Sequence, residues 1–238
     1  MPNIAPVLTP PLREGEHLTP DEFLRRWDAM PDLRFAELID GIVHMPSPLS
    51  DIHAEFEPRL SGWLWTYCLF TPGCALRGNV TTRMSHDGVP QPDLSLRIPA
   101  EMGGQSRLEG EYPSGAPELI IEVSQSTFAR DSGVKKRLYE RSGVREYLIV
   151  RPGKRQILWQ EMVNGKFQLI APDPDGLYRS RVFPGLWLDA EALWNNDLKA
   201  LYAVVERGAA MQNTRPLCAS WPRKHSSSTP PGLRGNKL

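Results

Sequence analysis

The sequence predicts an α/β fold, and three patterns along the chain support this prediction. Two short apolar segments, Leu119–Val123 and Glu146–Val150, are bounded by turn-forming residues, which is typical of strands covered on both faces. A helix is expected between them, from about Asp131 to Arg141, so the two strands should lie parallel. The dipeptides Asp40-Gly41 and Asn164-Gly165 indicate β-hairpins. The predicted fold therefore combines a parallel strand pair with antiparallel hairpins.

The length and composition of the chain fit one domain with appendages. Its 238 residues are 40% hydrophobic and include seven Trp, enough for a sizeable core. We expect residues 1–17 to form a flexible N-terminal arm and residues 18–210 to form the folded domain. Residues 211–238 are rich in Pro, Ser, Arg and Lys without apolar periodicity, which predicts a disordered basic tail.

Charge, cysteine content and hydropathy narrow the function classes. Lys plus Arg and Asp plus Glu are equal at 28 each, which counts against a general nucleic-acid binder but allows a local basic surface. The three cysteines form no CxxC pair, so we expect neither a zinc site nor a disulfide framework. No segment reaches the roughly 18 apolar residues of a membrane span, and the N-terminus lacks the apolar core of a secretory signal. A cytoplasmic protein that does not enter a membrane is expected.

The first third of the chain predicts a helix, a hairpin and a second helix. Thr19-Pro20-Asp21-Glu22 has the N-cap, the early proline and the third-position acid of a helix start. In the hairpin of residues 35–45, Glu37 lies on the first strand, and the pattern leaves open whether it faces solvent. Apolar residues recur at helical spacing from Asp51 to Phe70, which predicts a helix packed on the core, with His53 in its first turn.

The middle of the chain predicts three strands and a long loop. Residues 76–83 and 91–98 are expected to pair in antiparallel fashion. Asp93 follows a proline, which removes a donor from the strand ladder, so this acid is expected at a strand end. Residues 99–117 are rich in Gly, Glu, Pro and Ser and predict a long loop. The next strand carries Glu122 within an apolar run.

The helix after Glu122 contains two adjacent lysines, whose side chains are expected on different faces of the helix. Successive helical residues turn by about 100°, which places Lys135 in the same arc as Val134, Leu138 and Tyr139. Lys136 falls outside this arc and is expected to face solvent. A lysine on the inner edge of a helix needs a reason, such as a carboxylate partner. Beyond it the sequence predicts a hairpin at 157–170 and short helices at 190–194 and 198–207.

Two acids on neighbouring strands and a lysine on the next helix suit the hydrolysis of a phosphodiester. A divalent cation held by Asp93 and Glu122 would neutralise phosphate charge and activate a water. Lys135 would position or deprotonate that water, or stabilise the developing negative charge. A structural ion pair has the same sequence pattern, so the residues alone leave both interpretations open.

Several short motifs occur in an order that resembles one known family. They are Glu37-Leu38-Ile39-Asp40-Gly41, Met45-Pro46-Ser47-Pro48 followed by His53, Gln91-Pro92-Asp93, Ile121-Glu122-Val123-Ser124-Gln125-Ser126-Thr127, Asp131-Ser132-Gly133-Val134-Lys135, Leu138-Tyr139 and Gly143-Val144-Arg145-Glu146-Tyr147. Together they resemble the Uma-two family of endonucleases, a branch of the PD-(D/E)xK, restriction-endonuclease-like superfamily, over about residues 18–195. The resemblance implies a restriction-endonuclease-like α/β nuclease domain, in which helices flank a mixed β-sheet with added β-hairpins, and an active site of the Mg²⁺ type.

The resemblance also implies roles for individual residues. Asp93 and Glu122 match the metal-binding acids, and Glu37 matches an early acid that completes the metal shell. The lysine of the superfamily often lies two residues after the second acid, where this chain has Ser124. Lys135 matches the variant in which the lysine has moved to the following helix, in agreement with its place on the helical arc.

The basic residues that follow Glu122 suggest where a substrate would bind. Nine Lys or Arg and three acids lie between Arg130 and Arg155, and such a basic face suits a phosphate backbone, although a solvated helix face has the same pattern. His53, Arg130 and Lys136 are the candidate substrate contacts, and the expected substrate is DNA. Nucleases of this superfamily often act as dimers, so a homodimer is considered, although the sequence identifies no interface.

These observations predict a Mg²⁺- or Mn²⁺-dependent DNA endonuclease. The alternative from another class is a catalytically inactive nuclease-like fold that binds nucleic acid or a protein partner. In a third interpretation, the domain is a scaffold in which Lys135 only neutralises Glu122.

Overall fold

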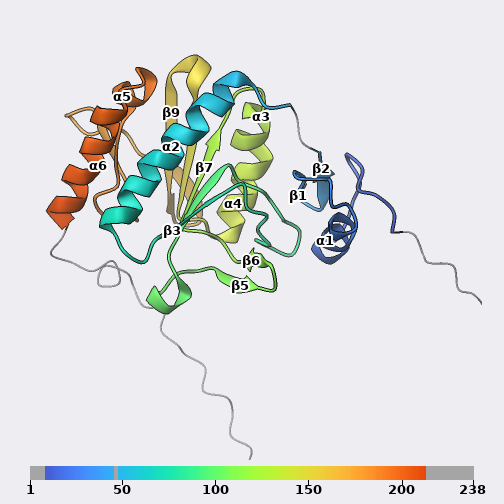
Figure 1. The fold of residues 1–238 in the computed structure, drawn as a ribbon. Helices are drawn as coiled ribbons and strands as arrows, with labels where there is room; N and C mark the ends of the chain where they lie inside the picture. Colours follow the sequence, from blue (N-terminus) through green and yellow to red (C-terminus); the bar gives the residue numbers. More distant parts are fainter. Residues whose placement is uncertain (1–8, 46–47, 213–238) are drawn as a thin grey trace, which may run out of the picture.

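The structure of the protein, a computed structural model, describes residues 9–45 and 48–212. Most of the expected C-terminal tail, at 213–238, and the first part of the expected N-terminal arm, at 1–8, lie outside the described residues. Figure 1 shows a central sheet with helices on both sides and a smaller unit of α1, β1 and β2 beside it. Cys68 and Cys74 are both free thiols. Within the described ranges, none of the helices combines the length and apolar character that crossing a bilayer requires.

The central sheet has six strands in the order β10-β9-β8-β7-β4-β3. Their bounds are β3 Ala75–Gly78, β4 Leu94–Arg97, β7 Leu119–Val123, β8 Glu146–Arg151, β9 Gln156–Val163 and β10 Lys166–Leu169. The pair β7 and β8 is parallel, and every other neighbouring pair in this sheet is antiparallel. The predicted parallel crossover from β7 to β8 is therefore confirmed, as is the predicted hairpin of β9 and β10 at one edge of the sheet.

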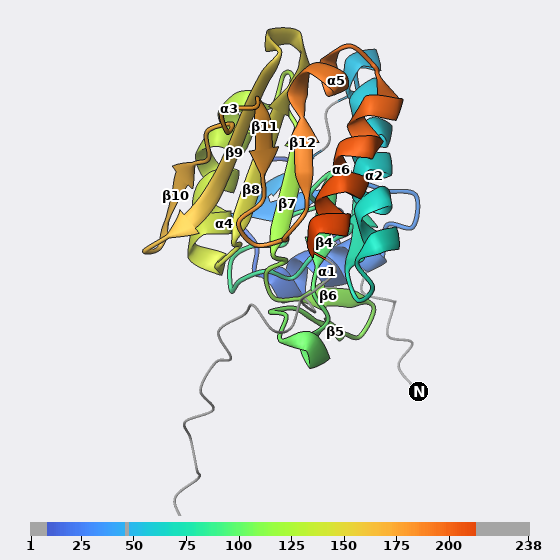
Figure 2. The ribbon, with the colours of Figure 1, turned by 90° about the vertical axis from the view of Figure 1, so that its left-hand side faces the viewer.

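Residues of β7 alternate between the two faces of the sheet, and this alternation positions the site. Leu119 and Ile121 pack in the cluster that contains α2 (Asp51–Phe70) and α6 (Leu198–Gln212), on one face. Ile120 packs in the cluster of α4 (Lys136–Ser142), on the opposite face (Figure 2). Because side chains along a strand alternate with period two, Glu122 falls on the α4 face.

The crossover helix between β7 and β8 is built in three segments. They are α3 Phe128–Arg130, the π-helical segment η2 Asp131–Lys135, and α4 Lys136–Ser142, which ends at Gly143 with φ 84°. A left-handed glycine at this position is a common helix stop. The sequence predicts one regular α-helix here, and the structure differs from this prediction by the π turn.

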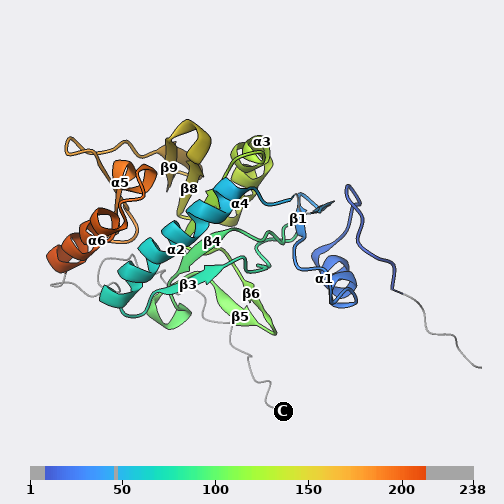
Figure 3. The same ribbon diagram turned by 45° about the horizontal axis from the view of Figure 1, so that its top comes forward.

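The N-terminal unit of α1, β1 and β2 carries Glu37 at the start of β1. Helix α1 (Pro20–Asp28) starts at the expected cap, where the Thr19 hydroxyl accepts a hydrogen bond from the Glu22 N–H over 3.3 Å. Strands β1 (Glu37–Ile39) and β2 (Ile42–His44) form the predicted hairpin, and Asp40 and Gly41 both have positive φ, as a two-residue turn of this type requires. Figures 1 and 3 show this unit set to one side of the sheet.

Residues 9–17 pack against this hairpin, although the sequence predicts a flexible arm there. Leu12 is buried, and the N–H of Gly15 donates a hydrogen bond to the carbonyl oxygen of Val43 over 2.8 Å. Because Leu12 belongs to the same apolar cluster as Phe23 and Trp27 of α1, burial holds the segment in place.

Other differences concern the loops and the end of the chain. The stretch from residue 99 to 117 contains a 3₁₀ turn, η1 (Ala100–Met102), and a small hairpin of β5 (Arg107–Glu109) and β6 (Tyr112–Ser114) instead of only a loop. Strand β3 ends at Gly78 and β4 begins at Leu94, so both strands are shorter than expected. The remaining elements are η3 Pro152–Lys154, β11 Leu177–Arg179, β12 Trp187–Asp189 and α5 Ala190–Trp194.

Candidate active site

A pocket of about 140 Å³ opens beside the carboxyl end of β7, between the β1–β2 hairpin and the crossover helix. Its lining includes four acids and one lysine from four separate parts of the chain: Glu37, Asp93, Glu122, Asp131 and Lys135. The four residues that the sequence predicts to be catalytic therefore lie around one pocket. Asp131 joins them, although the sequence interpretation gave it no role.

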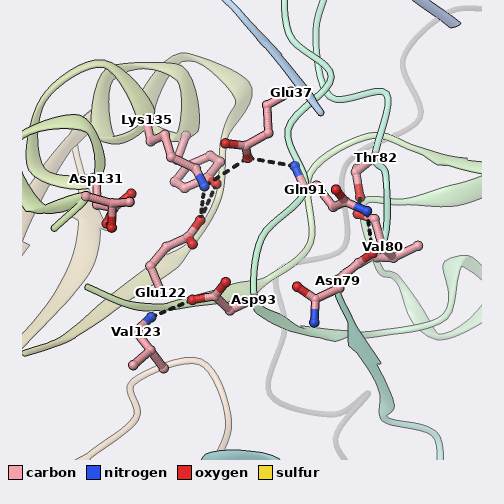
Figure 4. A network of polar contacts seen from close by, with 12 residues as sticks. Glu37, Asn79, Val80, Thr82, Gln91, Asp93, Glu122, Val123, Asp131 and Lys135 are labelled. Atoms are coloured by element: carbon pink, nitrogen blue, oxygen red, sulfur yellow. Dashed lines mark hydrogen bonds and ion pairs between the residues drawn. The ribbon is translucent and has the colours of Figure 1, made fainter. Parts of the chain in front are cut away.

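Lys135 lies between two of the predicted acids. Its Nζ atom is 2.9 Å from Oε1 of Glu37 and 2.7 Å from Oε1 of Glu122 (Figure 4). The Lys135 side chain is only 5% exposed, so its predicted inward orientation is confirmed. Lys136 takes the other direction and forms an ion pair with Glu140, four residues along the helix.

The π-helical segment η2 carries two charged groups that line the same pocket. It begins at Asp131 and ends at Lys135, both buried and both in the pocket lining. A π turn contains one more residue than an α turn, and such turns occur frequently at functional sites. The Thr127 hydroxyl donates a hydrogen bond to Oδ2 of Asp131 over 2.6 Å, which holds this carboxylate at the start of the segment.

Asp93 is held at the end of the strand pairing between β4 and β7. The register of this pair ends at Leu94 opposite Ile121, and Oδ2 of Asp93 accepts the next free N–H of β7, that of Val123, over 2.7 Å. The same oxygen lies 3.0 Å from Nε2 of His53. The sequence-based expectation that Asp93 lies at a strand end is confirmed.

His53 connects Asp93 to a second pair of polar side chains. Its Nδ1 atom lies 3.6 Å from Oε2 of Glu57, and Oε1 of Glu57 accepts a hydrogen bond from the Asn79 amide over 2.7 Å. The hydrogen bond from His53 to Asp93, together with the charges of Asp93 and Glu57, outweighs burial and raises the pKa of His53. His53 is thus turned toward the acids, as a group that orients Asp93.

Burial and crowding of carboxylates control the electrostatics of the cluster. Burial raises the pKa of Glu122 well above its usual range; Lys135 opposes this, while Asp93, Asp131 and Glu37 add to it. Burial alone would lower the pKa of Lys135, but the charges of Glu122, Glu37 and Asp131 outweigh it and raise that pKa well above its usual value. Lys135 is therefore a charged ammonium group in a region with excess negative charge.

Tyr139 is a site residue that the sequence interpretation missed. Its side chain is fully buried, and its hydroxyl donates a hydrogen bond to Oε1 of Glu122 over 2.7 Å, the same oxygen that Lys135 contacts. The signal was present, because Tyr139 follows Lys135 by four residues on the same helical arc. Tyr147, whose ring centroid is 5.0 Å away, holds the helix by donating to the carbonyl oxygen of Asp131.

The donor set fits a hard divalent cation. Asp93 and Glu122 offer carboxylate oxygens at the same pocket, and the surplus of buried carboxylates over cationic groups would be offset by such an ion. Among the residues that the structure describes, no three or more His, Cys, Asp or Glu form a metal-binding group. Mg²⁺ is usually bound by one or two carboxylates and keeps several waters, so two acids suffice for it, whereas a structural zinc site needs more ligands.

Glu37 has a different position from the one that the metal shell of the resemblance implies. It lies across Lys135 from Glu122, and its Oε1 atom accepts the N–H of Gln91 over 2.9 Å in addition to the Lys135 ammonium group (Figure 4). In this arrangement Glu37 orients Lys135. A direct bond from Glu37 to a metal stays a prediction.

The three candidate substrate contacts occupy different positions. Arg130 lines the pocket, His53 lines it but faces Asp93, and Lys136 is not part of the lining. The local basic excess is largely used in contacts within the protein. Arg141 pairs with Asp40 and Asp87, Arg155 with Glu191, and Arg151 stacks on the Phe128 ring at 3.5 Å. Of the expected basic face, the structure places Arg130 and Lys135 at the pocket, and Lys135 is already paired with Glu37 and Glu122.

Two comparisons with known proteins show the family and the fold of the chain. The model of the Uma2 family, described as "Putative restriction endonuclease", matches residues 20–191. A crystal structure of a "putative nuclease belonging to DUF820" from Anabaena variabilis ATCC 29413 has a similar fold, with a TM-score of 0.59 and 17% sequence identity over 75% of this chain and 98% of that chain. No curated protein matches the chain. The predicted fold, a restriction-endonuclease-like mixed sheet flanked by helices with added hairpins, is confirmed.

Proposed function

The chain belongs to the Uma2 family, and from this membership and the pocket geometry we propose that it is a Mg²⁺- or Mn²⁺-dependent endonuclease that hydrolyses phosphodiester bonds in DNA. The observation that carries the proposal is the placement of the Lys135 ammonium group between two carboxylates, beside a third, in one open pocket. A helix lysine in contact with a strand acid at a pocket is the arrangement that the proposed chemistry needs.

Asp93 and Glu122 would hold the cation through their carboxylate oxygens. When bound, the cation would offset phosphate charge and lower the pKa of a coordinated water. Lys135 forms ion pairs with two carboxylates, so it would act by donating hydrogen bonds to the attacking water or to a phosphate oxygen. Glu37 orients Lys135, and Tyr139 orients Glu122, so both catalytic groups are held in place by buried partners.

DNA as the substrate is part of the proposal and is supported by the family description. Arg130, in the pocket lining, would contact a phosphate next to the scissile one. A homodimer and a cytoplasmic location stay predictions.

Incubation of the purified protein with single-stranded, duplex and branched DNA, with and without Mn²⁺, tests the proposal directly. We expect cleavage only with the metal and expect Asp93→Ala to abolish it while the circular dichroism spectrum stays unchanged. Glu206→Ala, on the exposed side of α6, is the matched acid-removal control and should cleave like the wild type. Unimpaired metal-dependent cleavage by Asp93→Ala would contradict the assignment.

One observation favours a second candidate function, a nuclease-like fold that binds without cutting. Oε1 of Glu122 already receives both the Lys135 ammonium group and the Tyr139 hydroxyl, which competes with metal coordination. Titration calorimetry separates the two functions. If the site takes a metal, Mg²⁺ releases or absorbs heat in the wild type and not in Glu122→Ala; if it only binds a partner, both proteins give the heat of dilution.

A further inference from the structure

The pocket has an apolar wall that the proposed chemistry does not use. We define this wall by four lining residues: Phe35, Met45, Pro48 and Leu49. Phe35 is 37% exposed and Leu49 is 65% exposed. A single exposed apolar residue needs no explanation, but several that line the same pocket as a charged cluster indicate a binding surface.

The apolar wall is tied directly to the charged cluster. Phe35 precedes Glu37 by two residues, and both line the pocket. Glu37 in turn contacts Lys135. A phosphate held near Lys135 would therefore share the pocket with the Phe35 side chain.

The pocket also has polar lining residues outside the charged cluster. They include Gln125, Ser126 and Arg130, from the segment that follows β7, and Asn79 and Gln91. A ligand in this pocket would therefore meet both apolar, partly aromatic side chains and hydrogen-bonding groups. A nucleobase has this combination, with a flat apolar face and a polar edge.

From these contacts we propose that the apolar wall stacks the base of one unstacked nucleotide, and that the substrate class is single-stranded DNA or a single-stranded segment of it. The inference rests on the proposed function, which it makes more specific. Both faces of a base in a continuous duplex are covered by its neighbours, so the base would have to flip out before it could reach Phe35, at a cost in unstacking. A single strand offers bases with free faces.

The size of the pocket limits its occupant to a small part of a nucleotide strand. Its volume of about 140 Å³ is well below the roughly 300–1,000 Å³ of sites for drug-sized ligands.

Binding measurements that do not depend on cleavage test the inference. Fluorescence anisotropy would compare three labelled DNAs of equal length: a single strand, the matching duplex, and a single strand with abasic sites. Ca²⁺ replaces Mg²⁺, and a denaturing gel run afterwards shows that the DNA is intact. The variants are Phe35→Ala and Leu49→Ala, with Leu108→Ala on β5 as the control, because it removes another exposed apolar side chain outside the pocket.

We expect the wild type to bind the single strand at least about tenfold more tightly than the duplex or the abasic strand, in the range of one stacked base. Phe35→Ala should remove most of that preference, Leu49→Ala part of it, and Leu108→Ala none. Equal binding of all three DNAs by the wild type, or an unchanged preference in Phe35→Ala, overturns the inference. The binding and cleavage assays can contradict the two proposals independently. A protein that prefers single strands but never cuts contradicts the proposed function, and it leaves the proposal of base stacking on the apolar wall supported.

Discussion

The ammonium nitrogen of Lys135 lies 2.7 Å from Oε1 of Glu122, and both side chains are at most 5% exposed. Taking two opposite charges out of water costs free energy that only close contact and further hydrogen bonds offset. Here Tyr139 supplies a further hydrogen bond to Glu122, and Glu37 supplies a second partner for Lys135. Substitutions in this pair should therefore change the free energy of unfolding as well as the activity.

Removing one member of this pair should destabilise the protein more than removing both. Lys135→Met leaves Glu122 buried without its cation, and we expect a loss of about 3–5 kcal/mol in the free energy of unfolding. Lys135→Met combined with Glu122→Gln should recover much of that loss, and all of these variants should be inactive. Urea unfolding of the wild type, both single variants and the double variant gives the coupling energy. A scaffold in which the pair is dispensable predicts instead that Lys135→Met is as stable as the wild type.

The two buried tyrosines at the site should differ in their effect on activity. Tyr139→Phe removes a donor to the Glu122 carboxylate, and we expect a loss of about 1.5–3 kcal/mol in stability, as for hydrogen bonds to charged groups, with a clear drop in cleavage rate. Tyr147→Phe is the matched control because its hydroxyl donates to a main-chain carbonyl oxygen, that of Asp131, and it should cost about 1 kcal/mol. Equal cleavage rates for Tyr139→Phe and the wild type would show that Glu122 needs no such support.

His53 should affect metal binding through Asp93. His53→Ala removes the group 3.0 Å from Oδ2 of Asp93 and leaves the carboxylate itself in place. Outer partners of metal ligands typically change affinity by about 10–100-fold when removed. Titration calorimetry with Mn²⁺ measures the change, and His86→Ala, at a side chain that is 89% exposed, is the control. Identical Mn²⁺ affinity in His53→Ala and His86→Ala would contradict this role.

Glu146, which does not line the pocket, should make the free energy of unfolding depend on pH. It begins β8, is fully buried, and accepts hydrogen bonds from the Ser180 hydroxyl and the Arg181 and Val182 N–H groups. Burial raises the pKa of Glu146 to about 7, although these donors oppose the rise. An unfolded glutamate titrates near about 4.3, so the folded chain holds a proton that the unfolded chain releases. Its stabilising contribution is present below the unfolded pKa and is lost as pH rises through about 7.

The measurement for Glu146 is the free energy of urea unfolding between about pH 5 and about pH 8. The wild type should lose stability on the order of 3 kcal/mol or less from this group as the pH rises. Glu146→Gln should reduce that slope, whatever its effect on absolute stability, and Glu206→Gln should keep it. A wild-type slope that persists unchanged in Glu146→Gln would assign the pH dependence to other groups.

Much of the sheet could be predicted because its signals are local. The runs at β7 and β8 are short and apolar, and the hairpin turns carry their own sequence marks at Asp40-Gly41 and Asn164-Gly165. The small hairpin of β5 and β6 was not predicted, because it has little burial of its own and is held by contacts with Arg83, whose N–H donates to Pro113 and whose carbonyl oxygen accepts from Gly115. Pairing of that kind leaves no periodic pattern in the sequence.

The site shows the same division between local and long-range signals. The inward direction of Lys135 followed from helical geometry alone, and the position of Asp93 followed from the proline before it. The π turn at Asp131–Lys135 and the bond from His53 to Asp93 did not follow, because each depends on what another element places opposite. The basic residues between 130 and 155 misled for the same reason, since acids such as Asp40, Asp87 and Glu191 that pair with them come from distant parts of the chain.

The contact between Glu37 and Lys135 also has a consequence for the order of events after synthesis. It joins a hairpin near the N-terminus to a helix in the second half of the chain, and contacts between such distant segments form slowly because long loops must close first. Until the hairpin arrives, Lys135 lacks one of its two carboxylates and the pocket lacks the wall that carries Phe35. The proposed activity would therefore require a docked hairpin, because only then does the pocket carry both Glu37 and Phe35.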